Sequence, residues 1–99
     1  MNAEIKGNEI ILFGRLTREN ADTFKQIVSE AETDLLDEII LNFENVDYIN
    51  SAGIGGVISV YKMLCDRNKK LTLIKLKHSV FSVFKIAGLI KILNINEEN

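Results

Sequence analysis

The sequence has one cysteine, one histidine and no proline among its 99 residues. A lone Cys65 excludes an internal disulfide, and no second cysteine stands at metal-ligand spacing, so the sequence offers no basis for zinc or redox chemistry. We interpret Cys65 as a small apolar residue on a helix face. His78 has no serine or cysteine in a catalytic spacing, and we expect it on the surface at the start of a helix. We therefore expect no metal, no cofactor and no enzyme activity.

Long apolar runs are also missing, since none approaches the roughly 20 residues that a bilayer crossing needs. Residues 1–6 lack the basic and then apolar pattern of a secretory signal, so we expect a cytoplasmic protein without membrane contact. Hydrophobic residues make up 46% of the chain and charged residues 26%, which is the balance of an ordinary globular protein. The length suits one core, and we expect residues 1–99 to form a single domain.

The net charge of −2 conceals an asymmetry between the two halves of the chain. Residues 1–50 carry 4 basic and 11 acidic residues, a net −7, whereas residues 51–99 carry 8 and 3, a net +5. In a compact domain this predicts solvated faces of opposite sign, or a surface that steers a charged partner. Because the basic residues lack interleaved aromatics and a recognition-helix pattern, we expect protein partners rather than nucleic acid.

Two antiparallel strands are expected at the start of the chain. Glu9–Phe13 is an apolar run that ends at Gly14. The preceding Gly7–Asn8 is typical of a tight turn after Ile5, which makes the pair a hairpin.

A helix and a central strand are expected next. Residues 20–33 place apolar side chains on one helical face, with Asn20 or Thr17 available as the cap. That face consists of Ala21, Phe24, Ile27, Val28 and Ala31. Ile39–Phe43 is short and apolar on both sides, which is typical of a central strand, and we expect a turn at Glu44–Asp47.

The strongest helical pattern begins at Ser51. Its apolar stripe consists of Ile54, Val57, Ile58, Tyr61, Leu64 and Cys65. The polar segment Asp66–Lys70 then predicts a turn, and Leu71–Leu76 predicts a strand.

A last helix and strand are expected near the C-terminus. Residues 80–87 form a helical face, Gly88 is a natural left-handed stop, and Ile90–Leu93 returns to strand alternation. We expect Asn96–Asn99 to be frayed. A hairpin followed by three alternations of helix and strand predicts an α/β fold, with helices packed on a mostly parallel or mixed sheet.

Three glycines follow Ser51, in the sequence Gly53-Ile54-Gly55-Gly56. A dinucleotide fingerprint would need a further glycine where Ile58 stands, and a Walker loop would need Lys-Ser or Lys-Thr soon after the glycines. Each glycine in a helix interior costs up to about 1 kcal/mol relative to alanine. We therefore interpret the glycines as thinning the first helical turn so that another protein can approach it.

Ser51 itself has two interpretations. As an N-cap its hydroxyl would accept a hydrogen bond from an amide two or three residues on, a contribution of about 1 kcal/mol. Alternatively, its position at a turn among small residues suits a substrate of a serine kinase. The residue pattern leaves both interpretations open.

The segment Asn50-Ser51-Ala52-Gly53-Ile54-Gly55 resembles the motif of a STAS domain, specifically of the bacterial anti-sigma factor antagonists. In that family Asp-Ser-Ser/Ala-Gly-Leu/Ile-Gly follows a strand and opens a helix. Further similar positions are Gly14-Arg15-Leu16, Leu41-Asn42-Phe43, Tyr61-Lys62 and the segment from Val80 to Ile92. The resemblance covers nearly the full chain and implies a mixed sheet of about five strands.

The resemblance implies a phosphorylation switch at Ser51. The unmodified protein would bind an anti-sigma factor that is also a serine kinase, with nucleotide bound to that partner, and so free a sigma factor. Phosphorylation of Ser51 would end the binding, and a serine phosphatase would reset it. The implied partner surface consists of Thr17, Asn50, Ser51, Ala52, Gly53, Ile54 and Gly55. The domain itself would be a monomer or weak homodimer.

Two residues depart from the family pattern. The family commonly has aspartate where this chain has Asn50, and another aspartate where it has Thr17. Both replacements keep hydrogen-bonding capacity but remove negative charge beside Ser51. Ala52 leaves Ser51 as the only hydroxyl in the motif. The departures motivate an alternative, a non-switching accessory STAS subunit of a lipid-transport complex or a signalling scaffold.

Overall fold

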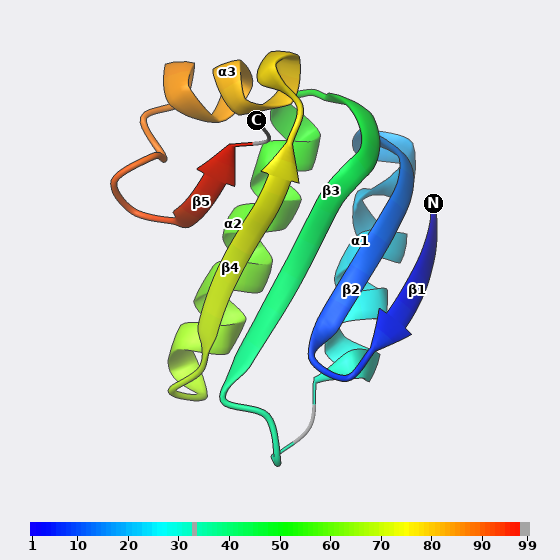
Figure 1. Ribbon diagram of the computed structural model, residues 1–99, viewed down its shortest axis with the longest axis vertical. Helices are drawn as coiled ribbons and strands as arrows, with labels where there is room; N and C mark the ends of the chain where they lie inside the picture. The colour runs from blue at the N-terminus through cyan, green and yellow to red at the C-terminus, as the bar shows by residue number, and fades with distance from the viewer. Residues whose placement is uncertain (33, 98–99) are drawn as a thin grey trace.

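Strands and helices alternate along the chain after an initial pair of strands (Figure 1). The computed structural model describes residues 1–32 and 34–97, except the side chain of Glu97. The strands are β1 (Asn2–Lys6), β2 (Glu9–Leu16), β3 (Glu38–Ile49), β4 (Lys70–Leu76) and β5 (Asn94–Glu97). The helices are α1 (Arg18–Ala31), α2 (Ser51–Asp66) and α3 (His78–Ile86). The predicted α/β order is confirmed.

The strands form one mixed sheet in the order β1-β2-β3-β4-β5. β1 and β2 are antiparallel and joined by a tight turn in which Gly7 has φ +62°, as the hairpin pattern predicts. β2, β3, β4 and β5 are parallel neighbours. The carboxyl ends of β2, β3 and β4 consequently meet at one edge of the sheet, the upper edge in Figure 1.

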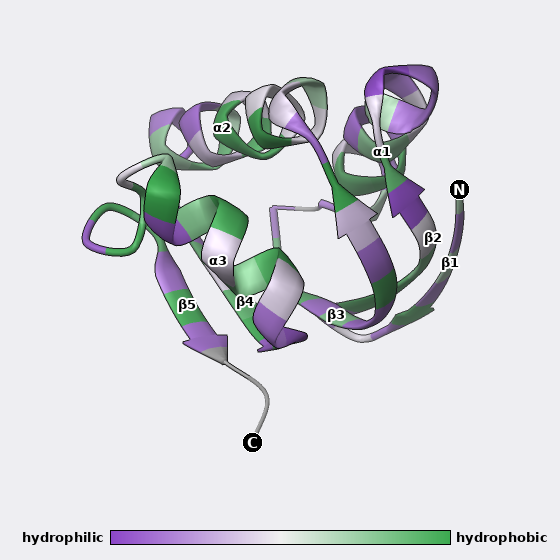
Figure 2. Ribbon diagram, turned by 90° about the horizontal axis from the view of Figure 1, so that it is seen from above, coloured by the Kyte–Doolittle hydropathy of each residue, from purple (hydrophilic) through white to green (hydrophobic). Residues whose placement is uncertain are grey.

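Helices α1 and α2 lie side by side on one face of the sheet, and α3 lies across the carboxyl end of β4 (Figure 2). The core fills the space between the helices and the sheet. Fully buried Phe24 of α1 and Leu64 of α2 belong to it. Phe43 of β3 meets Phe84 of α3 edge to face, with ring centroids 6.2 Å apart. This contact anchors α3 to the sheet.

The predicted turn at Glu44–Asp47 is wrong, because β3 continues through it to Ile49. β2 likewise passes through Gly14 to Leu16 instead of ending there. The two strands stay paired over this polar stretch, with shifts of register on either side of Gly14, whose φ is +121°. The main-chain ladder therefore overrides side-chain polarity here.

Near the C-terminus the predicted strand at Ile90–Leu93 is also wrong. These residues form turns and a bend. Leu93 is apolar because it belongs to the hydrophobic core, not because it lies in a strand. The strand β5 follows at Asn94–Glu97, so Asn96 belongs to a strand rather than to a frayed end. The rest of that prediction, residues 98 and 99, lies outside the described residues.

Helix positions agree with the sequence patterns in most respects. α1 begins two residues earlier than expected, and the last residue of the expected helix, Thr33, lies outside the described residues. In α2, Ile54, Val57 and Leu64 are buried as predicted, but Cys65 is exposed on the helix surface. None of the helices in the described part of the chain is long and apolar enough to cross a membrane.

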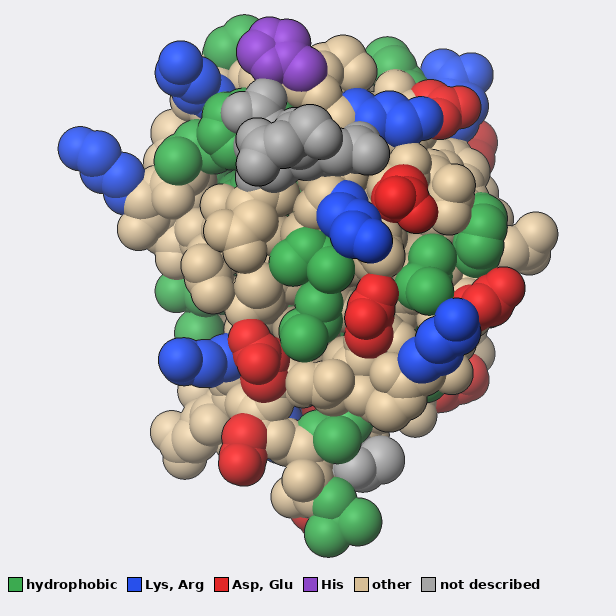
Figure 3. Space-filling model, viewed as in Figure 1, with side chains coloured by type: hydrophobic (Ala, Val, Ile, Leu, Met, Phe, Trp, Pro, Cys, Tyr) green, Lys and Arg blue, Asp and Glu red, His purple; other side chains and the backbone are tan. Residues whose placement is uncertain are grey.

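The opposite charges of the two halves of the chain neutralise each other within the folded molecule. Ion pairs join acids of the first half to bases of the second, and basic and acidic side chains are interspersed on the face shown in Figure 3. These pairs are Lys75 with Glu44, Lys77 with Asp47, and both Arg67 and Lys69 with Glu32. The expected faces of opposite sign are therefore not seen on that side of the sheet.

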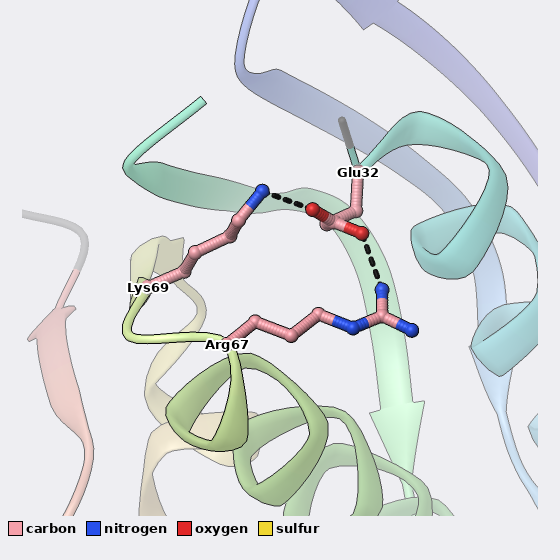
Figure 4. Close-up of polar contacts among 3 residues, drawn as sticks. All are labelled: Glu32, Arg67 and Lys69. Atoms are coloured by element: carbon pink, nitrogen blue, oxygen red, sulfur yellow. Dashed lines mark hydrogen bonds and ion pairs between the residues drawn. The ribbon is translucent and has the colours of Figure 1, made fainter. Parts of the chain in front are cut away.

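The cluster around Glu32 joins the end of α1 to the turn before β4 (Figure 4). Its carboxylate receives hydrogen bonds from Arg67 and Lys69. The side chains of Glu32 and Lys69 are each only 7% exposed, so this is a largely buried ion pair. The hydrogen bond from Lys69 is the main cause that lowers the pKa of Glu32 below its ordinary value.

Candidate functional site

Thr17 and Asn50 follow directly after β2 and β3, at the edge where the carboxyl ends of the parallel strands meet. The amide of Asn50 donates a hydrogen bond to the carbonyl of Leu16, 3.3 Å away, which holds the two strand ends together. Both Thr17 and Asn50 line one open cavity of about 480 Å³. The fold thus brings together two candidate residues that lie 33 positions apart in the sequence.

The N-cap of α2 is Asn50, not Ser51. The Asn50 side chain accepts a hydrogen bond from the amide of Gly53, 3.1 Å away, and the backbone of Asn50 is extended. Ser51 is the first helical residue and is exposed. An asparagine amide oxygen satisfies a helix-start donor as well as a serine hydroxyl does, so the helix does not need Ser51 as its cap.

The three glycines after Ser51 are needed for different reasons. The prediction that all of them make room for a partner is therefore wrong. A Cβ on Gly53 would lie 2.1 Å from the carbonyl oxygen of Leu16, so this glycine is required by packing inside the molecule. Gly56 is buried and faces Phe24 of α1. Only Gly55 is exposed, and a Cβ there would have no neighbour within 4 Å. Close approach of a partner can therefore account for the glycine at position 55 but not for Gly53 or Gly56.

The implied partner surface is also smaller than the motif. Gly53 is buried and Ile54 is 7% exposed, so their assignment to that surface is corrected: both face the interior. Ser51 and Gly55 are exposed, and Asn50 and Ala52 are half-buried. Thr17 is also largely buried, at 8% exposed, and reaches the surface only as part of the cavity wall. The helical period explains the pattern, because with about 3.6 residues per turn the adjacent Gly53 and Ile54 share the face toward the sheet, whereas Ser51 and Gly55, four positions apart, share the face toward solvent.

Neither candidate cap of α1 acts through its side chain in the expected way. Thr17 occupies the cap position, but its hydroxyl donates to the Glu19 carboxylate, 2.8 Å away. The Asn20 side chain instead donates to the carbonyl of Arg15. The hydrogen bond from Thr17 is the main cause that lowers the pKa of Glu19, assisted by its own amide and by the charges of Arg18 and Arg15.

Sequence patterns missed two prominent side chains of the cavity. The Arg15 guanidinium lies 4.6 Å from the centre of the Tyr48 ring, on neighbouring strands. The full lining is Arg15, Thr17, Glu19, Asn20, Tyr48 and Asn50. Arg15 and Tyr48 each stand two positions before a candidate residue, a spacing that places them on the same strand ends. Nothing in the sequence showed that β2 and β3 were neighbours in this register.

His78, the remaining candidate for chemistry, is exposed as the first residue of α3, as expected. In the described part of the chain, no three His, Cys, Asp or Glu side chains lie close enough to hold a metal ion. The chemical group that the site presents is therefore the exposed hydroxyl of Ser51, beside a cavity of mixed charge.

These features define a small α/β domain in which a helix opens at the carboxyl edge of a mixed sheet. The model of the STAS domain family matches residues 2–98, and the chain belongs to that family. The anti-sigma-B factor antagonist of Staphylococcus aureus is 26% identical over 89 residues, which are 90% of this chain and 82% of that protein.

Three solved structures, two of them of the same protein, share the fold. A candidate anti-sigma factor antagonist from Thermotoga maritima has a TM-score of 0.80 at 23% identity, covering 96% of this chain and 84% of that one. The anti-sigma factor antagonist SpoIIAA in its unphosphorylated form has a TM-score of 0.75 at 22% identity, covering 99% and 87%. The same protein, of Bacillus, in its phosphorylated form has a TM-score of 0.68 at 21% identity, covering 99% and 90%. At these identities the likeness establishes the fold.

Proposed function

We propose that this protein is an anti-sigma factor antagonist controlled by phosphorylation of Ser51. The unmodified protein binds an anti-sigma factor that is a nucleotide-bound serine kinase, and this binding releases a sigma factor to activate transcription. The protein acts as a binding partner in the cytoplasm and catalyses nothing itself. The observation that carries the proposal is the exposed Ser51 hydroxyl at the first position of α2, next to the cavity that Thr17 and Asn50 line.

The position of Ser51 suits a reversible switch. A phosphate adds about −1.5 to −2 charge at pH 7, and the positive end of the α2 dipole tolerates that charge. Because Asn50 already caps the helix, Ser51 can be modified without loss of a structural hydrogen bond. In a closed interface the same charge would be desolvated without a counter-charge, which is costly. Phosphorylation therefore leaves the fold intact and ends binding, and a serine phosphatase restores it.

The contact surface that we propose has a polar and a small-residue part. Its members are Asn50, Ser51, Ala52 and Gly55, and Thr17, only 8% exposed, borders it in the wall of the cavity. The exposed Gly55 lets a partner approach the first turn of α2 closely, since no side chain stands there. The uncharged Thr17 and Asn50 contribute hydrogen bonds instead of negative charge.

The test is phosphorylation by a purified candidate kinase with ATP and magnesium, followed by localisation of the phosphate by mass spectrometry. We expect modification at Ser51 in the wild type, none in Ser51→Ala, and wild-type modification in Ser59→Ala. Ser59 is a matched control because it is an exposed serine on the same helix. Phosphate on Ser59, or no phosphate with a kinase that binds the protein, would contradict the switch. Binding to a transporter ATPase without phosphorylation would instead support the accessory-subunit alternative.

A further inference from the structure

Arg15 and Tyr48 form a cation–aromatic pair beside the candidate site. They are register partners in the parallel ladder of β2 and β3. The guanidinium lies 4.6 Å from the centre of the ring, within the range of a cation–π contact. Arg15 is exposed, and Tyr48 is 44% exposed, which is unusual for a large aromatic side chain of a central strand. The pair is held in place by the ladder yet open to a partner.

Arg15 makes no direct ion pair in the described part of the molecule. Its charge acts on Glu19 only from a distance, where it is a minor cause of the lowered pKa of that carboxyl. Glu19 lines the same cavity, but its carboxylate accepts the hydrogen bond of Thr17. A guanidinium carries five N–H donors in a planar fork that matches a carboxylate. Arg15 is therefore equipped to receive an acidic side chain from outside.

We propose that Arg15 and Tyr48 anchor the docking surface and that the partner segment seated in the adjoining cavity carries an aspartate or glutamate. This inference rests on the proposed function and names the chemistry of the partner. Arginine and tyrosine are enriched among the residues that dominate binding energy at protein interfaces. The cavity of about 480 Å³ continues from this pair to Asn50, the residue before Ser51, so one segment can contact both.

The polarity of the site follows from its neighbours. Thr17 and Asn50 are uncharged, so Glu19 is the one acidic side chain that lines the cavity with Arg15, and its carboxylate is engaged by the hydroxyl of Thr17. A partner carboxylate placed against Arg15 would then lie on the same edge as Ser51. Phosphorylation would set a dianion near that carboxylate, and like charges repel. The acidic partner residue thereby makes binding sensitive to the phosphate.

The experiment measures the dissociation constant of a purified kinase that phosphorylates Ser51, by calorimetry in the presence of ADP. Arg15→Ala should weaken binding by roughly 10-fold or more, as expected for an interface anchor. Arg18→Ala should change it by less than about 3-fold, as for a surface charge outside the contact. Arg18 is a matched control because it is an exposed arginine three residues away that does not line the cavity. Equal effects of the two variants would overturn the inference.

Further variants separate contact from charge and from folding. Arg15→Lys keeps the charge but loses the planar fork, and should remain weakened. Tyr48→Phe keeps the ring and should bind like the wild type, whereas Tyr48→Leu should weaken binding. Wild-type binding by Tyr48→Leu would contradict the anchor. Circular dichroism of each variant verifies that it is folded.

A charge exchange tests the partner chemistry directly. A kinase variant in which the contacting aspartate or glutamate is changed to lysine should bind the wild-type protein more weakly. The same kinase variant should bind the Arg15→Glu variant with restored affinity. If no partner acid shows this exchange, the carboxylate assignment is wrong. If Ser51 is phosphorylated and the wild type binds but Arg15→Ala binds equally well, the inference fails and the proposed function stands. If the wild type binds no kinase, both fail.

Discussion

Gly53 of α2 lies against the main-chain carbonyl of Leu16 at the end of β2. A Cβ at position 53 would be 2.1 Å from the Leu16 oxygen and 2.8 Å from Cγ1 of Ile49. Neither the carbonyl nor the ladder behind it can move aside cheaply, because the Leu16 carbonyl also accepts the hydrogen bond of the Asn50 amide. The contact sets how closely the start of α2 approaches the sheet edge, and so where Ser51 is presented.

Gly53→Ala should consequently destabilise the protein by about 1–3 kcal/mol or more, as overpacking does. Gly55→Ala is the matched control, because the new methyl group meets nothing within 4 Å. It should stabilise the protein by about 0.5–1 kcal/mol through helix propensity. Urea denaturation of the two variants gives both values. Similar stabilities of Gly53→Ala and Gly55→Ala would show that a methyl group fits between position 53 and the Leu16 carbonyl.

Asn50→Ala should cost about 1 kcal/mol through loss of the cap. Asn50→Asp keeps the acceptor for the Gly53 amide and should be as stable as the wild type or slightly more so. Ser51→Ala should change stability by less than about 0.5 kcal/mol, because it removes an exposed hydroxyl that is not the cap. A larger loss for Ser51→Ala than for Asn50→Ala in chemical denaturation would contradict this assignment.

A negative charge at position 51 should separate stability from binding. Ser51→Asp should raise the free energy of unfolding by about 0.3–1 kcal/mol, because the charge lies in the first turn of α2. Ser59→Asp, on the same helix but away from its start, should not gain stability. In a binding assay with the kinase, Ser51→Asp should be the weaker binder of the two. Tight binding by Ser51→Asp would argue against an electrostatic block.

Acid stability should depend on the cluster of Glu32, Arg67 and Lys69. The pKa of Glu32 is lowered in the folded state, so its carboxylate stabilises the protein above the ordinary pKa of 4.5. That contribution is lost as the pH falls through the lowered folded pKa. Glu32→Gln should therefore have a lower melting temperature than the wild type at pH 7, and the difference should shrink below about pH 4.5.

The control for the acid experiment is Glu30→Gln. Glu30 is an exposed glutamate of α1, two residues before Glu32, and its carboxylate accepts a hydrogen bond from Gln26. Its melting temperature should follow the wild-type curve from pH 7 to pH 3. An equal and parallel loss in both variants would show that the cluster in Figure 4 adds little to stability.

Local patterns predicted the elements whose apolar residues repeat with a clear period. The buried face of α1, with Phe24 and Val28, and the opening of α2 at Ser51 follow from helical spacing. Local patterns did not predict that β3 extends beyond Phe43, because the polar Glu44 and Asn45 are typical of a turn. Asn45 pairs with Phe13 of β2, and the amide of Glu44 donates to the side-chain oxygen of Asn42, 2.9 Å away. The pairing with β2 is a long-range interaction that no local window contains.

The same division applies to the site. Its motif, with Ser51 at the start of a helix, could be predicted from the chain alone, because small residues and a change of period mark a strand-to-helix junction. The sequence could not predict which residue caps α2, that Ile54 is buried, or why position 53 must be glycine. Each depends on which atoms of β2 lie against the first turn of α2.

By itself, the sequence determined the order of strands and helices and the serine at the helix start, because these follow from periodicity and local turn chemistry. Its pattern left a mostly parallel and a mixed sheet open. Only the tertiary structure decided that Arg15 and Tyr48 join the site and that Asn50, not Ser51, caps α2. The physical reason is the parallel register of β2 with β3, which brings residues more than 30 positions apart into contact at one edge of the sheet.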